Sequence, residues 1–148
     1  MGLTKKFFQE HLELLREIGL NQERLIAINE EIEMIPAKKN DGMPHAKNVH
    51  NDTIAIKYVK REEITEELEK LRSREKEETE EIKNAIYESE LKPEESQVIT
   101  LRYIDGIEWQ RVLKIMFSRY KNYEYKKHSY ERQMYRLRKR AFEKMGIK

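Results

Sequence analysis

The chain has 148 residues, of which 38% are hydrophobic and 39% charged, against about 45–50% and about 25% in typical soluble domains. These proportions exclude a broad globular core and favour an elongated helical architecture in which each helix buries one stripe. The absence of cysteine excludes thiol chemistry, disulfides and cysteine-ligated zinc. No run of residues approaches the roughly 18 apolar residues of a membrane span, and the first residues carry no secretory or myristoylation signal, so we expect a cytoplasmic protein.

The net charge of +2 conceals a strong asymmetry along the chain. Residues 107–148 contain 13 Lys or Arg and 4 Asp or Glu, a net charge of +9, whereas residues 1–106 contain 17 and 24, a net charge of −7. The basic part is therefore expected to meet a polyanion, although excess charge also serves solubility.

Apolar residues from Leu3 to Ile35 fall at helical spacing, which predicts a first helix that Pro36 ends. Gly19 lies inside this pattern, and Asn21 offers a cap for a helix that kinks or restarts there. Residues 36–51 contain two prolines and no periodicity, which predicts a loop. His45 and His50 lie in it without a set of acidic partners, so solvated histidines are favoured over a metal site.

A second helix is expected from Asp52, as its cap, to about Glu90. Ile64, Leu68 and Leu71 keep a heptad register, but Glu75 and Glu78 occupy the same seam, which predicts a solvated or weakly paired middle. The sequence thus predicts an all-α protein, with an acidic helical hairpin over residues 1–90 and a separate basic domain over residues 91–148. A homodimer through the same N-terminal stripes is the alternative to an intramolecular hairpin.

Three short helices are expected after residue 90. Pro93 opens the first, Asp105 and Gly106 end it, and Trp109 begins the second. The third runs from about Ser129 to Met145. The predicted inward side chains are Val98, Leu101, Ile104, Trp109, Val112, Leu113, Met116, Met134, Leu137, Ala141, Phe142 and Met145. Three helices around one such core are typical of domains that present a helix to DNA.

The outward side of the last helix is basic and predicts contact with double-stranded DNA. In its N-terminal half, Arg132, Gln133 and Arg136 are candidates for base contacts, since Arg pairs with guanine and Gln with adenine in the major groove. The candidates for phosphate contacts are Lys126, Lys127, Lys139 and Arg140. A basic helix that is merely solvated is the alternative interpretation.

Residues 98–112, with Leu101-Arg102-Tyr103 and a turn at Gly106, resemble the start of sigma-70 region 4-like domains. The segments 134–137 and 140–142 resemble the recognition helix of those domains. The order of helix, Gly42-Met43-Pro44 loop, long Glu-rich helix and basic domain is similar to that of small regulators from phages and prophages of Gram-positive bacteria, the ArpU-type late transcription regulators. The resemblance covers the chain from about residue 20 onward. It implies a helix-turn-helix, DNA binding through the last helix, possible control of transcription with RNA polymerase as a partner, and structural roles for Leu101, Tyr103 and Trp109.

One departure from that pattern is an insertion over residues 117–128, where a helix-turn-helix has a turn of about three or four residues. Tyr120, Tyr123 and Tyr125 alternate there with basic residues. They either stack on nucleic acid or fill a local cluster beneath the loop.

Among function classes, catalysis is the weakest, because the chain has no phosphate-binding glycine loop, no nucleophile motif and no His-Glu metal motif. We expect no cofactor and no metal. The leading hypothesis is a DNA-binding transcription regulator of phage or prophage origin. The alternative is a helical protein-interaction or assembly module, including a phage DNA-packaging recognition subunit, without sequence-specific DNA recognition.

Overall fold

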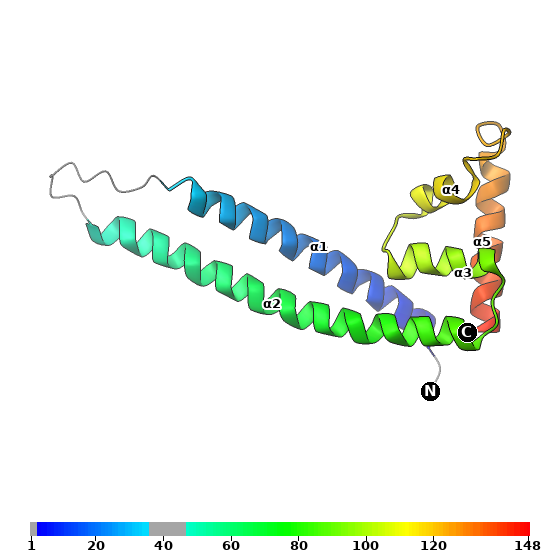
Figure 1. Cartoon of the computed structure of the whole chain (residues 1–148), viewed down its shortest axis with the longest axis horizontal. Helices are drawn as coiled ribbons and strands as arrows, with labels where there is room; N and C mark the ends of the chain where they lie inside the picture. The colour runs from blue at the N-terminus through cyan, green and yellow to red at the C-terminus, as the bar shows by residue number, and fades with distance from the viewer. Residues whose placement is uncertain (1–2, 36–46) are drawn as a thin grey trace. The chain divides into compact units, whose positions relative to one another are not determined.

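The computed structural model describes residues 3–35 and 47–148, and the side chains of the latter range from residue 53. Within these ranges every regular element is a helix, so the protein is all-α (Figure 1). The elements are α1 (Lys5–Glu33), α2 (Lys47–Glu88), α3 (Pro93–Ile99), the π-helical turn η1 (Thr100–Ile104), α4 (Trp109–Phe117) and α5 (Lys127–Lys144). None of the described helices is long and apolar enough to cross a membrane.

The helix starts and ends follow the local sequence with two exceptions. The first helix runs unbroken through Gly19. Asn21 does not cap a new helix there, since its side-chain Nδ2 donates a hydrogen bond to the carbonyl of Glu17, one turn back. The prediction of Asp52 as the cap of the second helix is wrong, since α2 begins at Lys47 and Asp52 lies inside it. Residues 47–51 contain neither Gly nor Pro, so nothing in the sequence prevents the helix from extending back over this part of the predicted loop. The rest of that loop, including Pro36, Pro44 and His45, lies outside the described residues.

The chain divides into two compact units: unit 1 comprises residues 1–15 and 75–148, and unit 2 comprises residues 16–74. This division differs from the predicted boundary at residue 90. Its cause is visible in the core of unit 1, where Phe8 of α1 and Ile82 of α2 are packed with Ile99 and Phe142 of the C-terminal helices. The ends of the two long helices thus form one folding unit with the basic C-terminal segment.

Unit 2 consists of the remaining parts of α1 and α2, which run in opposite directions (Figure 1). Its buried apolar side chains are Ile18, Ile28, Ile64, Leu68 and Leu71. All five occupy positions of the helical spacing expected for the two long helices, Ile18 and Ile28 on α1 and the other three on α2. Nζ of Lys57 on α2 lies 3.8 Å from Oε2 of Glu31 on α1.

The seam between the long helices is different in unit 1, where Glu78, in the stretch expected to be solvated or weakly paired, is not solvated but has a polar partner. Glu78 is buried, and its Oε2 lies 3.4 Å from Nδ1 of His11, which is also fully buried. The ring of His11 stacks on Phe7 at a centroid distance of 6.4 Å. A polar pair thus takes a place where the heptad pattern would have required two apolar residues.

Helix α3 passes into η1, and Gly106 ends this segment. The amide of Asp105 donates to the carbonyl of Thr100, five residues back, and the amide of Ile107 donates to the carbonyl of Leu101. Gly106 has a φ of 67°, and a Cβ placed on it would lie 3.2 Å from the side chain of Leu15. Both the backbone conformation and the close approach of α1 therefore favour glycine at this position.

A buried ion pair joins the start of α3 to the end of α5. Glu95 is 1% exposed, and its Oε1 accepts hydrogen bonds from the backbone amide of Lys92, at 2.9 Å, and from Nζ of Lys144, at 2.6 Å. Burial raises the pKa of this carboxyl group, but the hydrogen bonds and positive charges of Lys144 and Lys92 outweigh it, so the pKa lies below its ordinary value. The charged form of Glu95 is therefore the one that the fold stabilises.

We predict that Lys144→Met lowers the free energy of unfolding at neutral pH by about 1–3 kcal/mol, because it leaves a buried carboxylate with one donor. In the native protein this contribution is complete above the ordinary carboxyl pKa and is lost as the pH falls through the lower value of the folded state. The difference between the two proteins should therefore shrink on acidification. Urea unfolding at several pH values measures it, with Lys148→Met, at another exposed lysine, as the control. A difference that is independent of pH would contradict this explanation.

Candidate nucleic-acid interface

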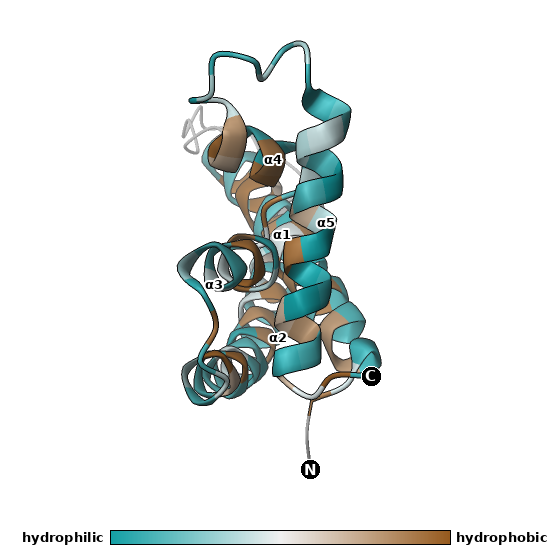
Figure 2. Cartoon of the chain, turned by 90° about the vertical axis from the view of Figure 1, so that its right-hand side faces the viewer, coloured by the Kyte–Doolittle hydropathy of each residue, from teal (hydrophilic) through white to brown (hydrophobic). Residues whose placement is uncertain are grey.

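The last helix has one apolar face and one basic face. Met134, Ala141 and Phe142 are buried in the core of unit 1. Arg132, Arg136 and Arg140 follow each other at intervals of four residues, so they share a face on the other side of the helix, and all three are exposed. In Figure 2 most of the α5 ribbon has the colour of hydrophilic residues.

The basic side chains on this face remain available to a partner. Within the described part of the chain, Arg132, Arg136, Lys139 and Arg140 form no ion pair. Glu143, in the last turn, is an exposed acidic residue of the same helix. Within unit 1, the positive charge of this face is therefore not neutralised by ion pairs among the described residues.

The structure places the remaining predicted contact residues less uniformly. Gln133 is exposed on α5, one residue beyond Arg132, and Lys126 is exposed at the N-cap of the helix. Lys127, the first residue of α5, is already engaged, since its Nζ lies 3.3 Å from a carboxylate oxygen of Glu124 and 5.5 Å from the ring centre of Tyr123. A phosphate at Lys127 would have to compete with Glu124, so this residue is the weakest of the predicted phosphate contacts.

Arg138 has a structural position that the sequence analysis did not identify. It is half-buried, and its guanidinium group lies 5.5 Å from the ring centres of both Trp109 and Phe142. Arg102 lies over the ring of Trp109 at 5.3 Å and donates a hydrogen bond to the carbonyl of Ile107. Trp109 is therefore a packing residue of the domain, as predicted. The inward position of Arg138 could have been predicted from the sequence, because Arg138 follows the buried Met134 by four residues and so lies on the same side of the helix.

The segment between α4 and α5 comprises residues 118–126, which shortens the predicted insertion at both ends. Four aromatic rings support it: Tyr130 of α5 stacks on Phe117, Tyr120 and Tyr123, at centroid distances of 5.0, 5.6 and 6.3 Å. Tyr123 is buried, whereas the side chain of Tyr125 is 91% exposed. Tyr120 and Tyr123 thus have the second of the two roles considered for these tyrosines, that of filling a local cluster. Tyr125 projects from this cluster.

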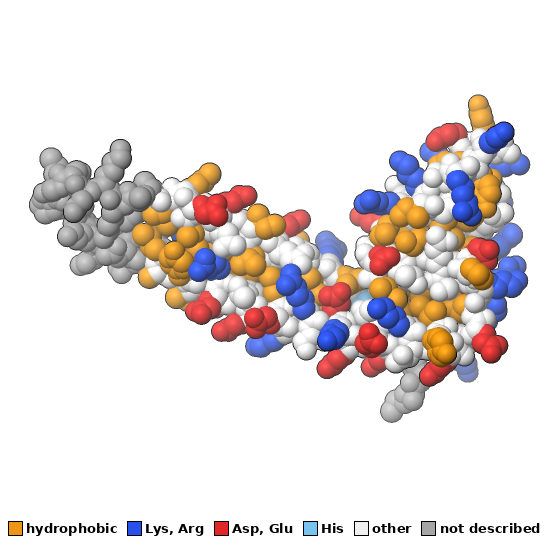
Figure 3. Space-filling model, in the orientation of Figure 1, with side chains coloured by type: hydrophobic (Ala, Val, Ile, Leu, Met, Phe, Trp, Pro, Cys, Tyr) orange, Lys and Arg blue, Asp and Glu red, His pale blue; other side chains and the backbone are white. Residues whose placement is uncertain are grey.

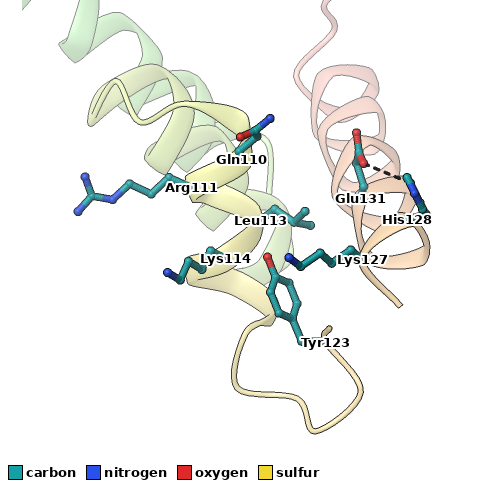
Figure 4. A pocket seen from close by; sticks show the side chains of 8 residues that line it. All are labelled: Gln110, Arg111, Leu113, Lys114, Tyr123, Lys127, His128 and Glu131. Atoms are coloured by element: carbon teal, nitrogen blue, oxygen red, sulfur yellow. Dashed lines mark ion pairs between the residues drawn. The ribbon is translucent and has the colours of Figure 1, made fainter. Parts of the chain in front are cut away.

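A groove of about 550 Å³ lies between α4 and the first turns of α5 (Figure 4). Gln110, Arg111 and Lys114 come from α4, and Lys127 extends from α5 towards them. The other lining residues are Leu113, Tyr123, His128 and Glu131. Glu131 is the one acidic residue that lines the groove, and its Oε2 lies 3.9 Å from Nδ1 of His128. Arg111 and Lys114 are exposed and add positive charge beside the N-terminal end of α5, which a count of charges in the last helix alone misses.

Comparison with protein-family models, with curated proteins and with solved structures finds no match. In the described part of the chain, no group of three or more His, Asp or Glu side chains is placed to hold a metal ion. The features of unit 1 that bear on function are therefore the basic face of α5 and the basic residues of α4 beside it.

We predict that Tyr130→Ala lowers the free energy of unfolding by about 2 kcal/mol, because it removes the ring on which three others stack. It should also accelerate hydrogen exchange of the amides at residues 120–126, whose segment loses its support. Tyr125→Ala is the matched control and should leave both quantities unchanged, since its side chain is almost fully exposed. Equal effects of the two substitutions would show that the ring stack does not order this segment.

Proposed function

We propose that this protein is a DNA-binding transcription regulator that contacts duplex DNA through the outward face of α5. The observation that carries the proposal is a row of exposed arginines on a helix whose opposite face is buried in a small domain. Such a helix presents its charges in a fixed geometry. It differs in this respect from a solvated basic tail, whose side chains would lose more conformational entropy on binding.

The dimensions and charge of α5 suit the major groove. An α-helix with its side chains is about 10–12 Å across, close to the groove width of about 12 Å. The 18 residues of α5 give it a length of about 27 Å at the usual rise per residue. In this proposal Arg132, Gln133 and Arg136 contact base edges, and Lys139 and Arg140 neutralise phosphates at the C-terminal end.

Phosphate contacts from the neighbouring helix complete the proposed interface. Arg111 and Lys114 on α4 are exposed and line the groove between the two helices, and Lys126 is exposed at the N-cap of α5. Contacts of this kind fix the position of a protein on the duplex, whereas the base contacts provide the preference for a sequence. The proposal therefore assigns sequence recognition to α5 alone, and positioning on the duplex to phosphate contacts from both helices.

The regulatory part of the proposal rests on the resemblance of residues 98–112 to sigma-70 region 4-like domains. That resemblance also supports a phage or prophage origin and RNA polymerase as a second partner. Duplex binding is supported separately, by the exposed basic residues of α5, and does not depend on whether the protein regulates transcription.

The first experiment is selection of bound sequences from a random duplex pool, followed by anisotropy titrations of the selected and a scrambled duplex. Arg136→Ala should reduce the preference for the selected duplex by about tenfold, since a good base contact contributes about 1–3 kcal/mol. Lys139→Ala should weaken binding of both duplexes equally and lower the slope of log affinity against log salt by about one.

Lys83→Ala, at an exposed lysine of α2, is the control and should change neither quantity. If the native protein binds no duplex at low salt, the proposal is wrong, and the basic face is then available for an acidic protein. If Arg136→Ala and Lys139→Ala behave identically, the division between base and phosphate contacts is wrong.

A further inference from the structure

A segment near the start of α2 is apolar on most sides of the helix. Five of the six residues from position 54 to 59 are apolar (Ile-Ala-Ile-Lys-Tyr-Val), and six consecutive residues cover every side of a helix with 3.6 residues per turn. Ile56 and Val59, three positions apart, are 55% and 54% exposed. A helical segment with so many apolar residues is normally buried on most sides, so part of its surface lacks a partner among the described residues of unit 2.

The facing helix of unit 2 carries a second exposed apolar stripe. Leu20, Ala27 and Met34 are spaced at seven residues and are all exposed, with Met34 at 81%. This exposed stripe is not the predicted heptad stripe of α1, whose residues Ile18 and Ile28 are buried within the unit. Figure 3 shows hydrophobic side chains gathered over this part of unit 2. We name Leu20, Ala27, Met34, Ile56 and Val59 the unit 2 patch.

We infer that the unit 2 patch is covered by the same patch of a second copy of this chain, in a four-helix arrangement. The opposite charges of the two helices favour this occupant, with the exception of Lys57 and Glu31, which pair within one copy. The α1 segment from Glu23 to Glu33 has four Glu and one Arg, a net charge of −3. The α2 segment from Thr53 to Arg61 has two Lys, one Arg and no acidic residue, a net charge of +3.

The symmetry of a dimer determines which of these segments meet. A twofold axis parallel to the helices places α1 of one copy against α2 of the other, and does so twice. The acidic segment of each copy then lies along the basic segment of its partner, with the apolar residues between them. A twofold axis perpendicular to the helices can instead place α1 against α1 and α2 against α2, which brings like charges together. The charges therefore favour the first arrangement.

The test uses the full chain without DNA, so that its result is independent of the proposed DNA binding. One variant reverses charges on α1 (Glu30→Lys with Glu33→Lys), and the other reverses charges on α2 (Lys60→Glu with Arg61→Glu). Neither variant touches the ion pair between Glu31 and Lys57. Analytical ultracentrifugation from micromolar to hundreds of micromolar concentration measures self-association, and circular dichroism checks that the helices are retained.

We expect the native chain to form a dimer, each variant alone to associate at least tenfold more weakly, and an equimolar mixture of the two to recover the native affinity. The mixture recovers because each acidic segment again meets a basic one. Val59→Asp should weaken self-association by a comparable factor without loss of helix, and Lys83→Ala should have no effect.

A native chain that stays monomeric throughout this range overturns the inference. So does a dimer that both charge-reversed variants form with unchanged affinity, since another surface would then hold it. A mixture no stronger than the separate variants would exclude the pairing of α1 with α2 of the second copy.

Discussion

The packing of α5 against two small clusters of apolar residues is the constraint on which the rest of unit 1 depends. Met134 belongs to one cluster, with Val98, Val112 and Met116, and Ala141 and Phe142 belong to the other, with Phe8 and Tyr103. Because these residues occupy one side of the helix, the arginines four positions apart must lie on the other side, where water can solvate them. The burial of one face thus determines the exposure of the other.

The clusters also explain which cations are available and which are not. Arg138 and Lys144 lie on α5 as well, but one is stacked against Trp109 and the other is bound to the buried Glu95. These two positive charges serve the fold. The exposed row of Arg132, Arg136 and Arg140 has no such role in the described structure, and this difference separates the candidate binding residues from the structural ones more sharply than charge alone.

The sequence predicted those parts of the structure that depend on local pattern. The turn signals at Pro93 and Gly106 follow from propensity, and the structure confirms them. Of the twelve inward positions predicted from helical spacing, seven are buried and five are half-buried. Contacts between distant segments could not be derived in this way. Glu78 appeared as a charge in an apolar seam, and only the position of His11, 67 residues away, shows how its burial is satisfied. Glu95 lies in the first turn of α3, and its partner Lys144 is 49 residues distant, so the sequence pattern around Glu95 gives no sign of this pair.

The candidate site was likewise predictable only where it depends on the pattern of a single helix. The exposed arginines of α5 follow from the phase of a single helix, whereas Arg111 and Lys114 depend on how α4 lies beside α5. The inferred dimer would add a second basic domain to the same assembly, and two linked binding modules gain affinity without any new contact to the duplex.

The most direct test of DNA binding through α5 is an NMR titration of the isotope-labelled protein with a duplex obtained by selection. The backbone amides and arginine side chains from residue 126 to 140 should show the largest changes in chemical shift, while amides around the unit 2 patch should show none. Changes confined to other segments, with the arginine signals of α5 unaffected, would contradict binding through α5.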